Sequence, residues 1–335
     1  MTDEPTGLDK KVANPIPLAE ACGRRSIKET ISAGMEWIAG AGQNGLWTDL
    51  TAQGSNADAW VTANVLARLG EFPQDQLSHV LREQIQRSLD WLEQARIKGS
   101  GWAGMGTSEP DAFTTSWSIL ALRAHNRSVP RSALDLVLSC RQPNGGFSAH
   151  AQGSPMDGPL NQSSPEITVT ALRALSITDS AAEEFLLSRL RTNPQAAVAG
   201  RASRLYVSAE ILDWESGLAP WPLLHLVSQF TVQFDLEKPY EQALLLRTLL
   251  RLRNSRAWLA AAALRDMQLS DGSWPACGVP FPSIQASSAI NPTAFCDTRV
   301  VASVTALSAL VMSESQPGLY FGFDLSRRLR NSEKM

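Results

Sequence analysis

The feature that most constrains the fold of this chain is a repeated pair of signals, a glycine-aromatic turn and the start of an apolar helix. The turn ends four apolar segments with helical spacing, as QNGLW at 43–47, GW at 101–102, QPNGGF at 142–147 and QLSDGSW at 268–274. Glycine is typical of the end of a helix, because it adopts left-handed backbone conformations. The first three turns lie roughly 45 to 55 residues apart, which indicates a repeat of helix pairs.

A six-residue helix start follows the turns. Its copies are DAWVTA at 58–63, DAFTTS at 111–116, EITVTA at 166–171, RLYVSA at 204–209 and DTRVVA at 297–302. Small and large apolar residues follow each copy at helical spacing, so we expect helices that are packed on both sides. The region 178–255 keeps the helical period without the turn, and we expect a sixth pair there. The pattern predicts an all-α protein, built either as a closed ring or as an open solenoid.

Composition limits the class of protein. The 335 residues are 44% hydrophobic and 19% charged, which is typical of a globular chain. The net charge is −3, from 30 basic and 33 acidic residues with no long run of one sign, so we expect no nucleic-acid partner. The four cysteines are far apart and form no CxxC pair, which favours reduced thiols.

The chain shows neither an apolar signal segment nor an apolar run long enough for a membrane span. We therefore expect a cytoplasmic protein without a transmembrane segment. The polar first residues predict a flexible lead at 1–25, followed by a single domain at 26–330.

The repeats resemble those of the squalene–hopene cyclase and protein-prenyltransferase β-subunit superfamily. QPNGGF and QLSDGSW resemble its QW-type motifs, and DAWVTA and DAFTTSW resemble its inner-helix starts. The resemblance runs from Glu29 to Leu310 and is weakest in the middle. It implies an (α/α)6 toroid, with six inner and six outer helices around a central apolar cavity.

The chain departs from the catalytic motifs of this superfamily. Class II cyclases carry a D-x-D-D-T-A box, but Phe113 stands where the proton-donating Asp belongs and Thr114 where the next Asp belongs. Phe113 also replaces the Cys of the prenyltransferase zinc site, and no matched position supplies its His. No D-D-x-x-D cluster for magnesium and diphosphate is present. We therefore expect no metal and no cofactor.

Two carboxylates are candidate proton donors. Asp111 is the first choice, since it matches the first Asp of the box and precedes Phe113. Asp297 is the second, because Arg299 is close enough to tune it. Burial beside an apolar cavity would raise the pKa of either acid and suit it to general acid catalysis. The competing interpretation for each is helix N-capping.

Aromatic residues are candidates to line the cavity. Trp60, Phe113, Tyr206 and Arg299 share the third position of the helix start. Trp117, Phe147 and Trp274 complete the candidate substrate-binding set. Aromatic faces can stabilise a carbocation. Packing between repeats is the other interpretation, and we favour it for the turn tryptophans Trp47, Trp102 and Trp274.

The leading hypothesis is a class II terpene cyclase-like enzyme, an isomerase or lyase. It would cyclise an apolar isoprenoid or polyene in an aromatic cavity by acid-initiated, metal-independent carbocation chemistry. One alternative is a non-catalytic binding protein for a lipid-like or isoprenoid ligand. Another is a helical interaction scaffold with a packed centre.

Overall fold

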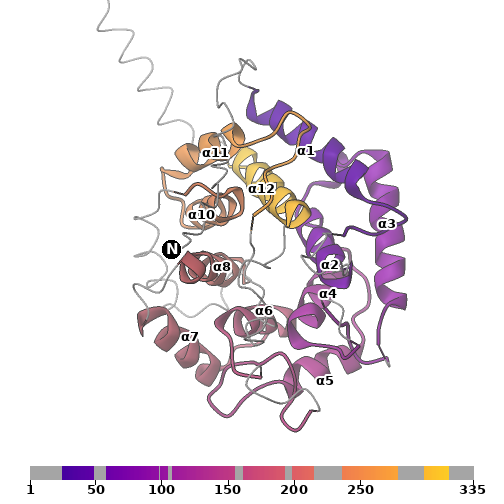
Figure 1. Ribbon diagram of the computed structural model, residues 1–335, viewed down its shortest axis with the longest axis vertical. Helices are drawn as coiled ribbons and strands as arrows, with labels where there is room; N and C mark the ends of the chain where they lie inside the picture. Colours follow the sequence, from indigo (N-terminus) through magenta and orange to yellow (C-terminus); the bar gives the residue numbers. More distant parts are fainter. Residues whose placement is uncertain are drawn as a thin grey trace, which may run out of the picture.

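The computed structural model describes residues 25–48, 58–97, 99–104, 108–154, 161–192, 198–214, 236–277 and 298–316; at 58, 192 and 198–203 it describes the backbone only. The helices in this part of the chain alternate between an inner and an outer layer (Figure 1). The inner ones are α2 (Asp58–Leu69), α4 (Ala112–Ala124), α6 (Pro165–Leu175), α8 (Val198–Asp213), α10 (Pro239–Arg251) and α12 (Arg299–Glu314). The outer ones are α1 (Ile27–Ala41), α3 (His79–Gln94), α5 (Arg131–Ser139), α7 (Ser180–Thr192) and α11 (Ala257–Asp266).

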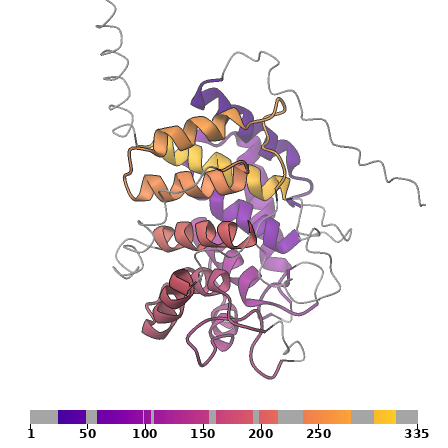
Figure 2. The ribbon, with the colours of Figure 1, turned by 60° about the vertical axis from the view of Figure 1, so that its left-hand side comes forward.

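The inner helices form a closed ring. Each packs against the next in chain order, and α12 packs against both α10 and α2. Figure 1 shows the inner helices around the centre with α1, α3, α5, α7 and α11 outside them, and Figure 2 shows α8, α10, α11 and α12 stacked nearly side by side. The all-α toroid predicted from the sequence is confirmed, and the open solenoid is excluded. The region 178–255 contributes α7 to the outer layer, and it contributes α8 and α10, which complete the inner ring.

The inner helices are buried on nearly every side, as their small and large apolar residues predict. In α12, thirteen of the sixteen residues are buried, including Ser303, Thr305 and Ser308. Thr305 bonds to its own helix, since its hydroxyl donates to the Val301 carbonyl at 2.7 Å, whereas Ser303 and Ser308 bond to residues outside α12. No described helix is both long and apolar enough to cross a membrane.

Turn glycines join neighbouring outer helices. Gly45, Gly145 and Gly272 all have left-handed φ angles, of 81°, 84° and 91°. A Cβ on Gly145 would lie 2.3 Å from the Ala181 carbonyl oxygen of α7, and one on Gly272 would lie 2.4 Å from the Ala33 carbonyl oxygen of α1. Only glycine allows this approach. The expectation that a left-handed glycine ends each of these helices is wrong. The C-cap of α1 is Gly42 in an extended conformation, and those of α3, α5 and α11 are Ala95, Cys140 and Met267.

Candidate functional site

Four equivalent hydrogen bonds fix how a turn meets the inner helix that follows it. In each, the backbone N–H of the turn aromatic donates to a helix hydroxyl. The pairs are Trp47 with Thr62 (3.1 Å), Trp102 with Thr115 (3.1 Å), Phe147 with Thr168 (2.8 Å) and Trp274 with Ser303 (3.0 Å). Because the bond recurs, these four hydroxyl residues occupy the same position in their repeats.

This register corrects the alignment made from sequence. Two positions before the shared hydroxyls stand Trp60, Phe113, Glu166 and Val301. The sequence alignment had placed Arg299 beside Trp60 and Phe113, and it had placed Glu166 at the start of its copy. The hydrogen bonds move the α6 copy two residues toward the N-terminus and the α12 copy two residues toward the C-terminus. Glu166 therefore takes the place on α6 that Phe113 has on α4. The recurring hydroxyl two residues later was the signal in the sequence that could have found it.

Three aromatic residues from three inner helices meet inside the ring, and we call Trp60, Phe113 and Tyr206 the central aromatic cluster. The Trp60 and Phe113 rings stack with centroids 6.4 Å apart, and the Phe113 and Tyr206 rings are tilted with centroids 6.3 Å apart. All three are buried. The Tyr206 hydroxyl lies 2.7 Å from the Thr170 hydroxyl of α6, and burial raises the pKa of Tyr206 to about 12. Three of the four residues that the sequence places at one position of the helix start therefore lie together, and their role in lining a substrate cavity stays a prediction.

Asp111 is the N-cap of α4. Its Oδ1 accepts the Thr114 N–H at 2.8 Å, and its Oδ2 accepts the Gly104 N–H at 2.9 Å. The side chain is 3% exposed. Burial raises the pKa of Asp111 above its ordinary value of 3.8, although the bonds from Thr114 and Gly104 oppose this shift. The residue therefore combines the capping role with the raised pKa expected of an acid.

Glu166 differs from Asp111 because it is not the cap of its helix. Ser164 is the N-cap of α6, and its hydroxyl accepts the N–H groups of Glu166 and Ile167. The Glu166 carboxyl accepts the Ser164 hydroxyl and is 5% exposed. Thr170 lies one turn further along the same helix face and bonds Tyr206. The face of α6 that carries Glu166 therefore borders the central aromatic cluster.

The remaining predicted residues lie elsewhere. Arg299 pairs with Asp271, donates to Ser273 and stacks over Trp37 of α1, with its Cζ 5.4 Å from the ring centroid. Its assignment to the inner aromatic set is therefore corrected, because α12 begins two residues later than the sequence alignment assumed. Asp297 lies outside the described residues.

Turn aromatics join the outer layer to the inner one. The indole N–H of Trp47 donates to Ile38, that of Trp102 to Leu92 and that of Trp274 to Leu264, at 2.9, 2.6 and 2.7 Å. Each acceptor belongs to the outer helix before the turn. Phe147 occupies the equivalent turn position and is fully buried. Packing, which the sequence favours for the tryptophans, explains these contacts, and Phe147 and Trp274 lie in the turns rather than in the central aromatic cluster.

Trp117 lies one turn after Phe113 on α4, and its ring contacts a buried arginine. The Arg68 Cζ lies 5.1 Å from the centroid of the Trp117 ring. Arg68 belongs to a set of charged residues near the C-terminal ends of the inner helices that we call the arginine network. Its members are Arg68, Glu71, Arg173, Glu210, Asp213, Arg247 and Arg251.

The arginine network links four inner helices. The Arg68 Nη2 lies 2.6 Å from Glu210 Oε1, and the Arg247 Nη1 lies 2.7 Å from Glu71 Oε2. Arg247 is also paired with Asp213. Burial by itself would raise the pKa of Glu71, but Arg247 and Arg68 outweigh burial and lower it to about 2. Sequence reasoning missed this network; the available signal was a charged residue within a helix predicted to be buried on all sides, such as Arg247 in LLLRTLL.

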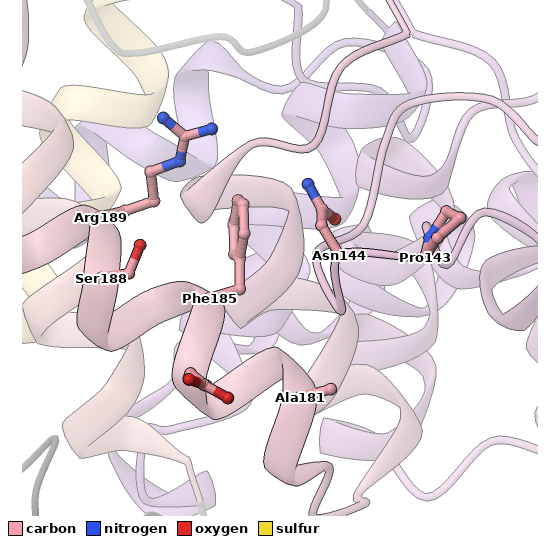
Figure 3. Close-up of a pocket in the computed structure, with 7 residues that line it drawn as sticks. Pro143, Asn144, Ala181, Phe185, Ser188 and Arg189 are labelled. Atoms are coloured by element: carbon pink, nitrogen blue, oxygen red, sulfur yellow. The ribbon is translucent and has the colours of Figure 1, made fainter.

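A separate cavity of about 480 Å³ lies on the outer layer, between the turn after α5 and helix α7. Figure 3 shows Asn144, Phe185 and Arg189 projecting into it. The Arg189 Cζ lies 5.3 Å from the centroid of the Phe185 ring. None of the predicted site residues lines this cavity. Among the described residues, no group of three His, Cys, Asp or Glu side chains could hold a metal ion.

Comparison with solved structures identifies the fold as that of the terpenoid cyclases. The apo type II terpene cyclase MstE from Scytonema matches at a TM-score of 0.66 and 18% identity, over 88% of this chain and 98% of MstE. A single-residue variant of MstE in complex with geranylgeranyl dihydroxybenzoate, its substrate, matches at a TM-score of 0.63 and 18% identity, over 85% and 96% of the two chains. A protein from Actinoplanes matches at a TM-score of 0.68 and 17% identity, over 86% of this chain and all of that one.

No family model and no curated protein matches the sequence. The solved neighbours establish that this chain has a terpenoid cyclase-like α/α toroid, as the sequence motifs predict. At 17–18% identity they establish the fold alone.

Proposed function

We propose that this protein is a class II terpene cyclase-like enzyme that cyclises an apolar isoprenoid without a metal. The observation that carries this proposal is the central aromatic cluster, with the buried carboxyl groups of Asp111 and Glu166 at the starts of two of the inner helices around it, on a fold whose solved neighbours include a type II terpene cyclase. A protonated carboxyl would add its proton to an alkene carbon, and a tertiary carbocation would form. Aromatic faces would stabilise the cation during ring closure. Loss of a proton to a base would end the reaction and leave an isomer of the substrate.

Asp111 is the proposed proton donor. Its raised pKa keeps more of the protonated form at a given pH, which is what a general acid requires. Glu166 is the rival, because it stands at the helical position of Phe113 and its helix is capped by Ser164 instead. Trp60, Phe113, Trp117 and Tyr206 are the proposed walls for the folded substrate.

A product assay tests the proposal. Purified protein is incubated with geranyl, farnesyl and geranylgeranyl diphosphates and with squalene, and organic extracts are analysed by mass spectrometry with and without phosphatase. Asp111→Asn, Glu166→Gln and boiled protein are run beside the wild type. Asp135→Asn is the matched control, because Asp135 is an exposed residue of outer helix α5.

The expected result is a cyclised product that disappears with Asp111→Asn and persists with Asp135→Asn. Loss of the product in Glu166→Gln, but not in Asp111→Asn, would show that Glu166 is the acid. Absence of a cyclised product from every polyene would contradict the enzyme proposal.

One observation favours a non-catalytic binding protein as a second candidate. Both Asp111 oxygens accept backbone N–H groups, which suits a residue whose only role is to cap α4. Binding of a polyene without turnover, undiminished in Asp111→Asn, would support this function.

A further inference from the structure

The C-terminal ends of four inner helices surround a pocket of about 230 Å³, here called the C-terminal pocket. Arg68 of α2, Arg123 of α4 and Arg173 of α6 line it, together with Asp213 and Trp214 at the end of α8. Trp117 forms part of its wall. The pocket lies outside the central aromatic cluster and takes no part in the proposed proton transfer.

Positive charge is in excess around this pocket. Three arginines, Arg68, Arg123 and Arg173, line it against the two carboxylates of Glu71 and Asp213. Arg123 lies at the rim, where its Nη1 donates to the Ser176 hydroxyl at 2.6 Å rather than to a carboxylate. The carbonyl ends of the parallel inner helices balance part of the excess. The remainder favours a small anion.

Several residues that line the pocket carry a buried hydrogen-bond donor with no hydrogen-bond acceptor among the described residues. They include the Arg68 Nε and the Trp214 Nε1, on side chains that are each 2% exposed. Leaving such a donor unpaired costs about 1–3 kcal/mol. An oxyanion in the pocket would supply the acceptors that these groups lack.

The electrostatics of Arg173 agree with this geometry. Burial lowers the pKa of Arg173 to about 10, with Arg68 and Arg247 adding to the decrease while Asp213 and Glu71 oppose it. A bound anion would favour the charged guanidinium and reverse part of this shift.

We propose that the C-terminal pocket binds a small oxyanion, a carboxylate or phosphate group, through Arg68, Arg123, Arg173 and the Trp214 indole N–H. Arginine suits this role, because its planar guanidinium presents several donors to such groups. The pocket volume admits a headgroup of this size and excludes a polyene, since sites for whole ligands are typically about 300–1,000 Å³.

The position of the pocket also bears on the substrate, and this second inference rests on the proposed cyclase function. Arg68 lies eight residues beyond Trp60 on α2, which corresponds to about 12 Å along the helix. A polyene with its reacting end at the central aromatic cluster would carry an anionic headgroup toward the C-terminal pocket. The substrate class is then a polyprenyl chain with a carboxylate or diphosphate group.

Isothermal titration calorimetry of the full chain tests the site without any need for turnover. The probes are inorganic diphosphate, farnesyl diphosphate, farnesoic acid and farnesol, in a phosphate-free buffer of constant ionic strength. We expect the farnesyl anions to bind at least tenfold more tightly than farnesol. Binding of inorganic diphosphate as well would indicate a site for free oxyanions, whereas binding of the farnesyl anions alone would indicate a headgroup site.

Three variants separate the pocket from general electrostatics. Arg123→Gln removes a partly exposed charge and should weaken anion binding about tenfold, as expected for a charge-assisted contact. Trp214→Phe removes the indole N–H and should weaken it about threefold. Arg251→Gln is the control, because Arg251 is 44% exposed, belongs to the arginine network and does not line the pocket; its effect should stay below twofold.

The results distinguish failure of this proposal from failure of the proposed function. Absence of binding by every anion, or an equal loss in Arg251→Gln and Arg123→Gln, would overturn the anion site. Binding of inorganic diphosphate with the expected variant effects, in a protein that makes no product from any polyene, would keep the site and remove the cyclase.

Discussion

The two ends of the inner helices differ in how they fill the interior of the ring. Near the N-terminal ends, aromatic rings meet, and the buried carboxyls of Asp111 and Glu166 stand at helix starts. Near the C-terminal ends, ion pairs connect helices far apart in the sequence, as from Arg247 to Glu71. The signs follow the helix dipoles, since carboxylates suit N-terminal ends and arginines suit C-terminal ends. The charged end links the inner helices to one another, while the aromatic end is where we propose that the reaction takes place.

The largest expected effect of a substitution lies at the charged end. Arg247→Met should destabilise the fold by about 3–5 kcal/mol, because it leaves the Glu71 and Asp213 carboxylates without a buried partner. Urea denaturation measures this free energy of unfolding. Arg251→Gln is the control and should cost at most about 1 kcal/mol, because Arg251 is partly exposed. Equal losses of unfolding free energy in the two variants would mean that burial does not determine how much these ion pairs stabilise the fold.

The second-largest effect is expected where the turns bond to the N-terminal ends of the inner helices. Thr115→Val removes the hydroxyl that accepts the Trp102 N–H and should cost about 1–3 kcal/mol, because a buried N–H is left unpaired. Thr115→Ser should retain most of the stability, since Ser303 plays this part in the last repeat. Chemical denaturation of both variants gives the comparison. A valine variant as stable as the serine variant would show that packing, and not this hydrogen bond, holds the turn against the inner helix.

A smaller effect concerns Asp111 and pH. Because its pKa is raised in the folded state, the folded protein binds the proton more tightly than the unfolded chain does. This contribution therefore favours the folded state below the ordinary pKa and is lost as pH rises through the raised one. Relative to wild type, the Tm of Asp111→Asn should rise as pH increases from about 4 to about 7. A constant difference across this range would show that the Asp111 pKa is not raised.

The smallest effect is a rate of chemical labelling. Burial raises the pKa of the Cys140 thiol to about 12, so the native protein should react with iodoacetamide at pH 8 far more slowly than the unfolded chain. Mass spectrometry of the Cys140 peptide measures the rate. Cys277 is only partly buried and serves as the internal comparison. Labelling of Cys140 at the rate of an exposed thiol would show that the aromatic end opens readily.

The aromatic end was largely predictable because its residues repeat. Trp60 and Phe113 occupy one position of a recognisable helix start, and the structure brings their rings together with Tyr206. The assignments of Glu166 and Arg299 were wrong in register, since the sequence shows a Glu or Asp near each start and does not show which residue caps the helix. The bond from Phe147 to Thr168 settles the register of α6.

The sequence alone determined that this is an all-α chain of helix pairs with an aromatic residue at a fixed place in its repeats. Helical periodicity and turn chemistry are local properties, so a single sequence carries them. Tertiary structure decided that α12 packs against α2 to close the ring, that α10 completes it, and that seven charged residues form one network. These features depend on contacts between residues such as Glu71 and Arg247, 176 positions apart. Pairing at that distance is set by how the helices pack, and it leaves no periodic signal in the chain.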